Sequence, residues 1–173
     1  MAIGSVMYSM ISTRPDIAFS ISLLSRFMSN SRRDHWAALK WLLRDLNGIL
    51  YQGLHYHNWS DFELIGFADS DFAGDKDGRK STTSYFFTLA SNCISWKSQQ
   101  QSVVALTTIK AEYIKATEAI KEAIWLQGNR EGGLPVSLVI AEAISEGAIS
   151  NLPFAYSWRL DAALSLLNDR SSA

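Results

Sequence analysis

The sequence has little cysteine, no excess of either charge and no long apolar run. Its 173 residues contain one cysteine, Cys93, which excludes an internal disulfide and is typical of a reducing intracellular compartment, whether cytoplasm or nucleus. The formal net charge of -1 excludes a strongly basic surface, so any nucleic-acid binding must depend on local basic patches or on bound metal. We expect no membrane span, because no apolar run reaches the required length, and no signal peptide, because the N-terminus lacks a basic region and a cleavage signal.

Apolar and aromatic residues are plentiful enough to build a packed core. Hydrophobic residues make up 47% of the chain and aromatic residues 12%, which favours a folded domain over a disordered segment. A chain of this length holds one domain, or one domain with an appendage. We expect Cys93 to be a small buried residue of a strand, because no base stands near it in the sequence to activate its thiol.

The first third of the chain has the periodicity of helices. Apolar residues recur at helical spacing over residues 2–11 and 14–28, and again from Ser31 to Gly48. Thr13 is a candidate cap of the second helix, and Ser31 with Asp34 has the spacing of a capping box before the third. These patterns predict a small helical unit.

After this unit the sequence changes to the pattern of strands. Residues 49–57 and 63–68 are strand candidates, and residues 82–89 and 93–97 predict two more that are joined by a short turn. Three antiparallel strands are the simplest arrangement for residues 63–97. Thr107 or Thr108 then caps a long helix that ends near Gln127, and its expected apolar face consists of Ile109, Tyr113, Ala116, Ile120, Ala123 and Ile124.

The last forty residues allow two interpretations. Residues 136–140 form an apolar run that suits a buried strand. Alternatively, Leu138, Ala141, Ile144 and Ala148 lie at the spacing of a helical stripe. The pattern alone leaves both open.

The stretch from Leu64 to Asp75 is an apolar strand that ends in Asp69 and continues into an acidic turn with a glycine. A carboxylate at the end of a rigid strand is a natural ligand for a divalent cation, although aspartate is also common in turns. Glu112 on the long helix is a second candidate ligand, with an exposed helix charge as the simpler interpretation. The spacing of Asp69, Asp71 and Gly74 also resembles the start of an EF-hand loop, but Lys80 stands where that loop requires glutamate.

Several motifs in fixed order resemble the C-terminal part of the Pol polyprotein of Copia-type retrotransposons. The resemblance covers residues 3 to about 127. Its motifs are Thr-Arg-Pro-Asp-Ile-Ala (13–18), Ala-Asp-Ser-Asp-Phe-Ala-Gly-Asp (68–75), Arg-Lys-Ser-Thr (79–82), Ile-Ser-Trp-Lys-Ser (94–98), Ala-Glu-Tyr-Ile (111–114) and Lys-Glu-Ala-Ile-Trp-Leu (121–126).

This resemblance implies an α/β fold in three parts. Residues 1–57 would be the helical connection that follows the reverse transcriptase. Residues 59–133 would be the N-terminal half of a ribonuclease H-like domain, with three antiparallel strands, a long helix and a possible fourth strand. Residues 134–173 would be a divergent tail, and the remainder of the Pol polyprotein is expected to be absent because Met1 begins inside the family pattern.

The resemblance also implies a chemistry and a set of site residues. Ribonuclease H domains cut the RNA strand of an RNA–DNA hybrid with two divalent ions, usually Mg²⁺ or else Mn²⁺, that are held by four acidic residues. Asp69 and Glu112 match the first two of these acids, as catalytic residues and metal ligands. Arg79, Lys80 and Ser81 are weaker candidates for contacts with the nucleic acid.

The third and fourth family carboxylates are missing from the sequence. If residues 136–140 form the fourth strand, Ala141 stands where the third acid should be, and Glu142 would point to the opposite face. We therefore predict that the chain has no useful nuclease activity. The alternative is a non-catalytic remnant that acts, if at all, as an interaction or nucleic-acid-binding module. Without a proper fourth strand, strand 63–68 would also be an unpaired sheet edge.

Overall fold

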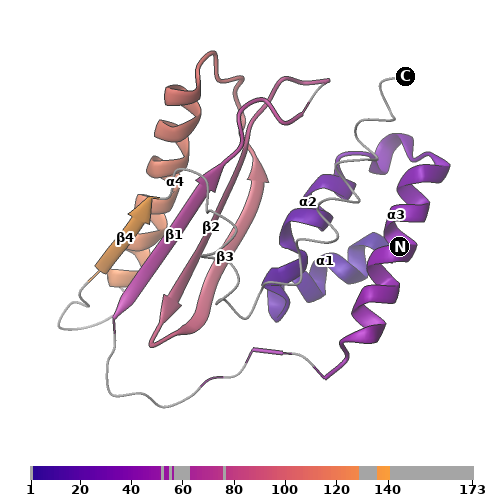
Figure 1. The fold of residues 1–173 in the computed structure, drawn as a ribbon, viewed down its shortest axis with the longest axis horizontal. Helices are drawn as coiled ribbons and strands as arrows, with labels where there is room; N and C mark the ends of the chain where they lie inside the picture. Colours follow the sequence, from indigo (N-terminus) through magenta and orange to yellow (C-terminus); the bar gives the residue numbers. More distant parts are fainter. Residues whose placement is uncertain are drawn as a thin grey trace. The chain divides into compact units, whose positions relative to one another are not determined.

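The computed structural model describes residues 2–51, 53, 54, 56, 63–75, 77–128 and 136–140 (Figure 1). The chain divides into two compact units between Leu54 and His55. The first is helical, and the second is a sheet with a long helix. Among the described residues, no helix is long and apolar enough to cross a membrane.

The helical unit consists of α1 (Ala2–Ser12), α2 (Ala18–Ser25) and α3 (Arg33–Gly48). Two short 3-10 turns, Pro15–Ile17 and Met28–Asn30, begin and end the middle segment. The predicted helices are thus confirmed, with the second shortened at both ends. Their apolar faces meet in one core, whose buried members are Val6, Ile17, Ile21, Leu23, Leu24, Ala38, Leu39 and Leu42.

Both predicted helix caps are wrong in detail. The N-cap before the second segment is Arg14, not Thr13, and no side chain caps it. Arg14 instead pairs with Asp16, and its Nε lies 2.8 Å from Asp16 Oδ1. The third helix begins after Arg32, whose backbone N–H donates a hydrogen bond to His35 Nδ1 at 3.0 Å. His35 thus takes the role in the capping box that the sequence analysis assigned to Asp34.

The predicted strand over residues 49–57 is also wrong where the structure describes it. Residues 49–51, 53, 54 and 56 are turn or irregular. An alternating pattern makes a strand only where a partner strand accepts its hydrogen bonds, and no described strand pairs with this segment. Tyr56 fixes its end of the segment through a side chain, because its hydroxyl donates to the Cys93 carbonyl at 3.1 Å.

The sheet has the strand order β3-β2-β1-β4. The strands β1 (Leu64–Ser70), β2 (Thr82–Leu89) and β3 (Asn92–Gln100) pair antiparallel, as predicted. The fourth strand, β4 (Val136–Ile140), runs parallel to β1 at its other edge (Figure 1). The strand interpretation of this segment is therefore correct for residues 136–140, whereas Ala141, Ile144 and Ala148 lie outside the described residues.

The pairing of β4 corrects the expectation of a bare sheet edge. Leu64 lies opposite Val136, and Ala68 lies opposite Ile140. Five residues of β1 thus have hydrogen-bonding neighbours on both sides. The pairing ends at Ala68, one residue before Asp69.

The long helix α4 (Thr108–Gly128) covers one face of the sheet (Figure 1). Thr107 caps it, since its Oγ1 accepts the backbone N–H of Lys110 at 3.2 Å. The core between helix and sheet consists of Leu64, Ala68, Tyr85, Phe87, Ala119 and Ala123.

The predicted apolar face of α4 is not the face that packs. Ile109, Tyr113 and Ile124 are exposed, as is Ile120. The buried stripe consists of Ala111, Lys115, Ala119 and Ala123, spaced four residues apart. Small alanines let the helix backbone approach the sheet closely, which the larger side chains would prevent. Of the predicted face, only Ala123 belongs to this stripe.

Candidate functional site

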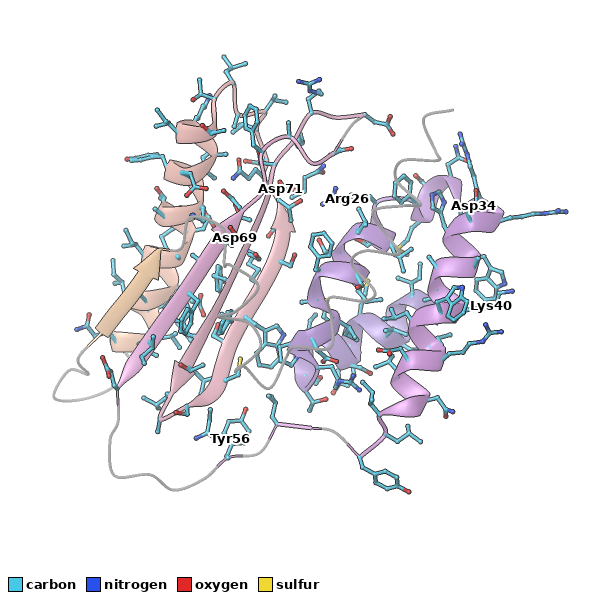
Figure 2. All side chains as sticks on the ribbon, in the orientation of Figure 1. Arg26, Asp34, Lys40, Tyr56, Asp69 and Asp71 are labelled. Carbon is cyan, nitrogen blue, oxygen red and sulfur yellow. The ribbon has the colours of Figure 1, made fainter. Side chains whose placement is uncertain are left out.

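Asp69 lies at the carboxyl end of β1, in register with Ser84 of β2 (Figure 2). Successive residues of a strand point to opposite faces, and Leu64 and Ala68 face α4 in the core. By this alternation Ser70 faces α4, and Asp69 faces the other side of the sheet. Within the described part of the chain, the Asp69 carboxylate makes no hydrogen bond or ion pair.

Glu112 stands in the N-terminal half of α4 and reaches the end of β1. The Ser70 hydroxyl donates a hydrogen bond to Glu112 Oε1 at 2.9 Å. The helix therefore brings Glu112 to Ser70, the residue that follows Asp69, although Ser70 and Glu112 are 42 positions apart in the chain. The role of Asp69 and Glu112 as metal ligands stays a prediction.

Lys115 is the residue of this site that sequence reasoning missed. Its side chain is 0% exposed, and its Nζ forms an ion pair with Glu112 Oε2. Three residues separate the two on the helix, a spacing that allows side chains to meet. The available signal was the register of Lys115 with Ala111, Ala119 and Ala123, because a residue in step with small residues shares their buried face.

The acidic turn after β1 uses its carboxylates to hold its own backbone. The Asp71 carboxylate accepts the backbone N–H of Thr82. A side chain at Gly74 would collide with that carboxylate, which is why glycine suits this position. Asp75 Oδ2 accepts from the Gln100 side chain at 2.6 Å. Asp71 and Asp75 are therefore engaged in turn structure, which further disfavours the EF-hand interpretation.

The three candidate nucleic-acid contacts differ in exposure. Arg79 is exposed and Lys80 is half-buried. Ser81 is 0% exposed, and its Oγ accepts the backbone N–H of Ala73 at 3.1 Å. Burial thus assigns Ser81 to the turn rather than to a surface that a substrate can reach. The prediction of phosphate contacts stays with Arg79 and Lys80.

These residues do not fit a site for two divalent ions. Both oxygens of Glu112 are engaged, one by the Ser70 hydroxyl and the other by the Lys115 ammonium. Among the residues that the structure describes, no three or more acidic, histidine or cysteine side chains gather as a metal site would require. The donor set at the end of β1 therefore amounts to Asp69 and an already paired Glu112.

Comparison with known proteins decides the family. Over 126 residues, 73% of its length, the chain is 51% identical to the Retrovirus-related Pol polyprotein from transposon TNT 1-94 of Nicotiana tabacum. It is also 35% identical over 124 residues to the Retrovirus-related Pol polyprotein from transposon RE2 of Arabidopsis thaliana. The chain belongs to the Pol polyproteins of Copia-type retrotransposons.

This member of the Pol family matches only a small part of those polyproteins, 9% of the tobacco protein and 8% of the Arabidopsis one. A different relative is the Secreted RxLR effector protein 161 of Plasmopara viticola, which is 42% identical over 125 residues. That match covers 72% of the present chain and 88% of the effector. No family model and no solved structure matches the chain.

Proposed function

We propose that the sheet unit derives from the first half of a ribonuclease H domain. Such a domain hydrolyses the RNA strand of an RNA–DNA hybrid with two divalent metal ions. The observation that carries the proposal is the position of Glu112, which α4 brings to Ser70 at the end of β1, the residue that follows Asp69 in the chain. The strand order, with three antiparallel strands, a long helix and a parallel fourth strand, supports the same origin.

In this proposal the chain itself does not cut the hybrid. Asp69 and Glu112 are two acids where the family uses four, and Glu112 is already neutralised by Lys115. The test is an assay with a labelled RNA–DNA hybrid in the presence of Mg²⁺ or Mn²⁺. We expect the wild-type chain to yield no more product than the Asp69→Asn variant. Metal-dependent cutting that disappears in Asp69→Asn would refute the claim of inactivity.

Hybrid binding is the activity that such a chain can retain, through Arg79 and Lys80 at the tip of the acidic turn. Fluorescence anisotropy with a labelled hybrid measures it. We expect the double variant Arg79→Gln, Lys80→Gln to bind more weakly and to show a smaller dependence on salt. The reason is that a protein with fewer phosphate contacts releases fewer counterions when it binds. The matched control is Lys110→Gln, Lys121→Gln, which removes the same charge from exposed sites on α4.

The second candidate function is an interaction module without nucleic-acid binding. One observation favours it, since the region shared with this chain makes up 88% of the effector from Plasmopara viticola. A related sequence region thus makes up nearly the whole of another protein. Absence of hybrid binding at moderate salt would favour this second function.

A further inference from the structure

A fully buried lysine side chain forms an ion pair at the candidate site. Lys115 is 0% exposed and pairs with Glu112, whose side chain is 36% exposed. Removing an ammonium group from water costs several kcal/mol unless a partner of opposite charge compensates it. Glu112 is thus the counterion of Lys115, and the Ser70 hydroxyl fixes its second oxygen at 2.9 Å.

In this arrangement the Lys115 ammonium already compensates the negative charge of Glu112, so that charge is not available to a divalent ion. A metal ion brought to the Glu112 carboxylate would meet the ammonium of Lys115 at short range, and like charges repel most strongly where water is excluded. The Lys115 side chain is 0% exposed, so its ammonium has no solvent into which it can withdraw. Binding of metal would therefore require the ion pair of Glu112 with the buried Lys115 to rearrange.

We propose that the Lys115 ammonium takes the place of a divalent cation at Glu112, so that the site is charge-balanced without metal. The inference rests on the proposed ribonuclease H origin only for the choice of Mg²⁺ and Mn²⁺ as probes. Its consequence is that removal of the Lys115 charge frees the Glu112 carboxylate for a divalent cation.

The test is calorimetric titration of MnCl₂ into the full chain. Lys115→Met keeps the length and volume of the side chain but removes its charge. We expect Lys115→Met to bind Mn²⁺ at least about tenfold more tightly than the wild type, a change of about 1.4 kcal/mol. The double variant Lys115→Met, Glu112→Gln should lose this gain. The matched control is Lys121→Met, which removes an exposed lysine with the same three-residue spacing to Glu118, and it should bind as the wild type does.

Several results would overturn the proposal. These are equal affinity of wild type and Lys115→Met, a gain that survives Glu112→Gln, and a gain of the same size in Lys121→Met. Circular dichroism reports whether each variant folds, and Lys115→Ala replaces Lys115→Met if the latter does not. The wild-type titration is decisive by itself in one direction, because saturable Mn²⁺ binding that is lost in Glu112→Gln contradicts the proposal without any change at Lys115.

The proposal and the proposed function fail separately. The titration uses the metal alone, whereas the ribonuclease H origin is tested with the RNA–DNA hybrid. A gain of Mn²⁺ affinity in Lys115→Met together with no hybrid binding would preserve the inference and remove the function. Hybrid binding through Arg79 and Lys80 without that gain would do the reverse.

Discussion

The two faces of α4 differ in side-chain size in a way that is opposite to a simple amphipathic helix. The face against the sheet carries small side chains, Ala111, Ala119 and Ala123, with Lys115 between them. The opposite face carries Ile109 and other large apolar side chains that are 44% to 79% exposed, namely Tyr113, Ile120 and Ile124. Close approach of the backbone, rather than side-chain size, therefore selects the packed face.

Two lysine–glutamate ion pairs on α4 show the same contrast between a buried and an exposed side of the helix. Lys115 and Glu112 are three residues apart, as are Lys121 and Glu118. Lys115 is fully buried, whereas Lys121 is 67% exposed. The buried pair keeps the Lys115 charge away from water, whereas water screens the exposed pair. The two pairs therefore contribute different energies although their spacing is the same. Each prediction below compares the inner face of the helix with the outer one.

The largest effect is expected from the loss of one partner of the inner pair. Glu112→Ala removes the acid that pairs with the buried Lys115 ammonium, which should lower the free energy of unfolding by about 3 kcal/mol. Glu118→Ala removes the acid of two exposed pairs, with Lys121 and with Lys97 of β3, and should cost less than about 1 kcal/mol. Urea unfolding followed by circular dichroism measures both. Equal costs would show that burial of Lys115 contributes nothing to the difference.

A smaller effect is expected from a change of size on either face. Ala119 is 0% exposed against the sheet, so Ala119→Leu should overpack the interface and cost about 1–3 kcal/mol. Ile120→Ala on the outer face should change stability by no more than about 0.5 kcal/mol. The same urea experiment compares them. A larger loss in Ile120→Ala than in Ala119→Leu would mean that the outer face is the packed one.

The smallest expected effect concerns the native thiol of Cys93, whose reactivity reports whether the sheet opens. Cys93 is buried in β3, as expected from the sequence, and burial raises its pKa to about 12. At about pH 8 its reaction with Ellman's reagent should be at least about a hundredfold slower in the folded chain than in urea, because the thiolate is scarce. Glu112→Ala should speed the reaction and Glu118→Ala should not. Rapid labelling of the folded wild type would contradict the buried position.

Elements that depend on local pattern were predictable from the sequence. The helical unit and strands β1 to β3 follow from periodicity, and the start of α4 after Thr107 follows from a cap that acts within a few residues. The strand expected over residues 49–57 failed because strand formation also needs a partner. The position of Glu112 at the end of β1 was predictable from the order of the elements, whereas Lys115 was not, since its burial depends on the rotation of the helix about its axis.

The sequence by itself determined the helical unit, strands β1 to β3 and α4, the Copia-type family of the chain, and Asp69 and Glu112 as its candidate acids. Only the tertiary structure decided which face of α4 meets the sheet, and that the buried Lys115 forms an ion pair with Glu112. The physical reason is that burial belongs to a pair of surfaces. The sequence of a helix specifies the side chains on its surface, but packing against the sheet decides which of them are buried.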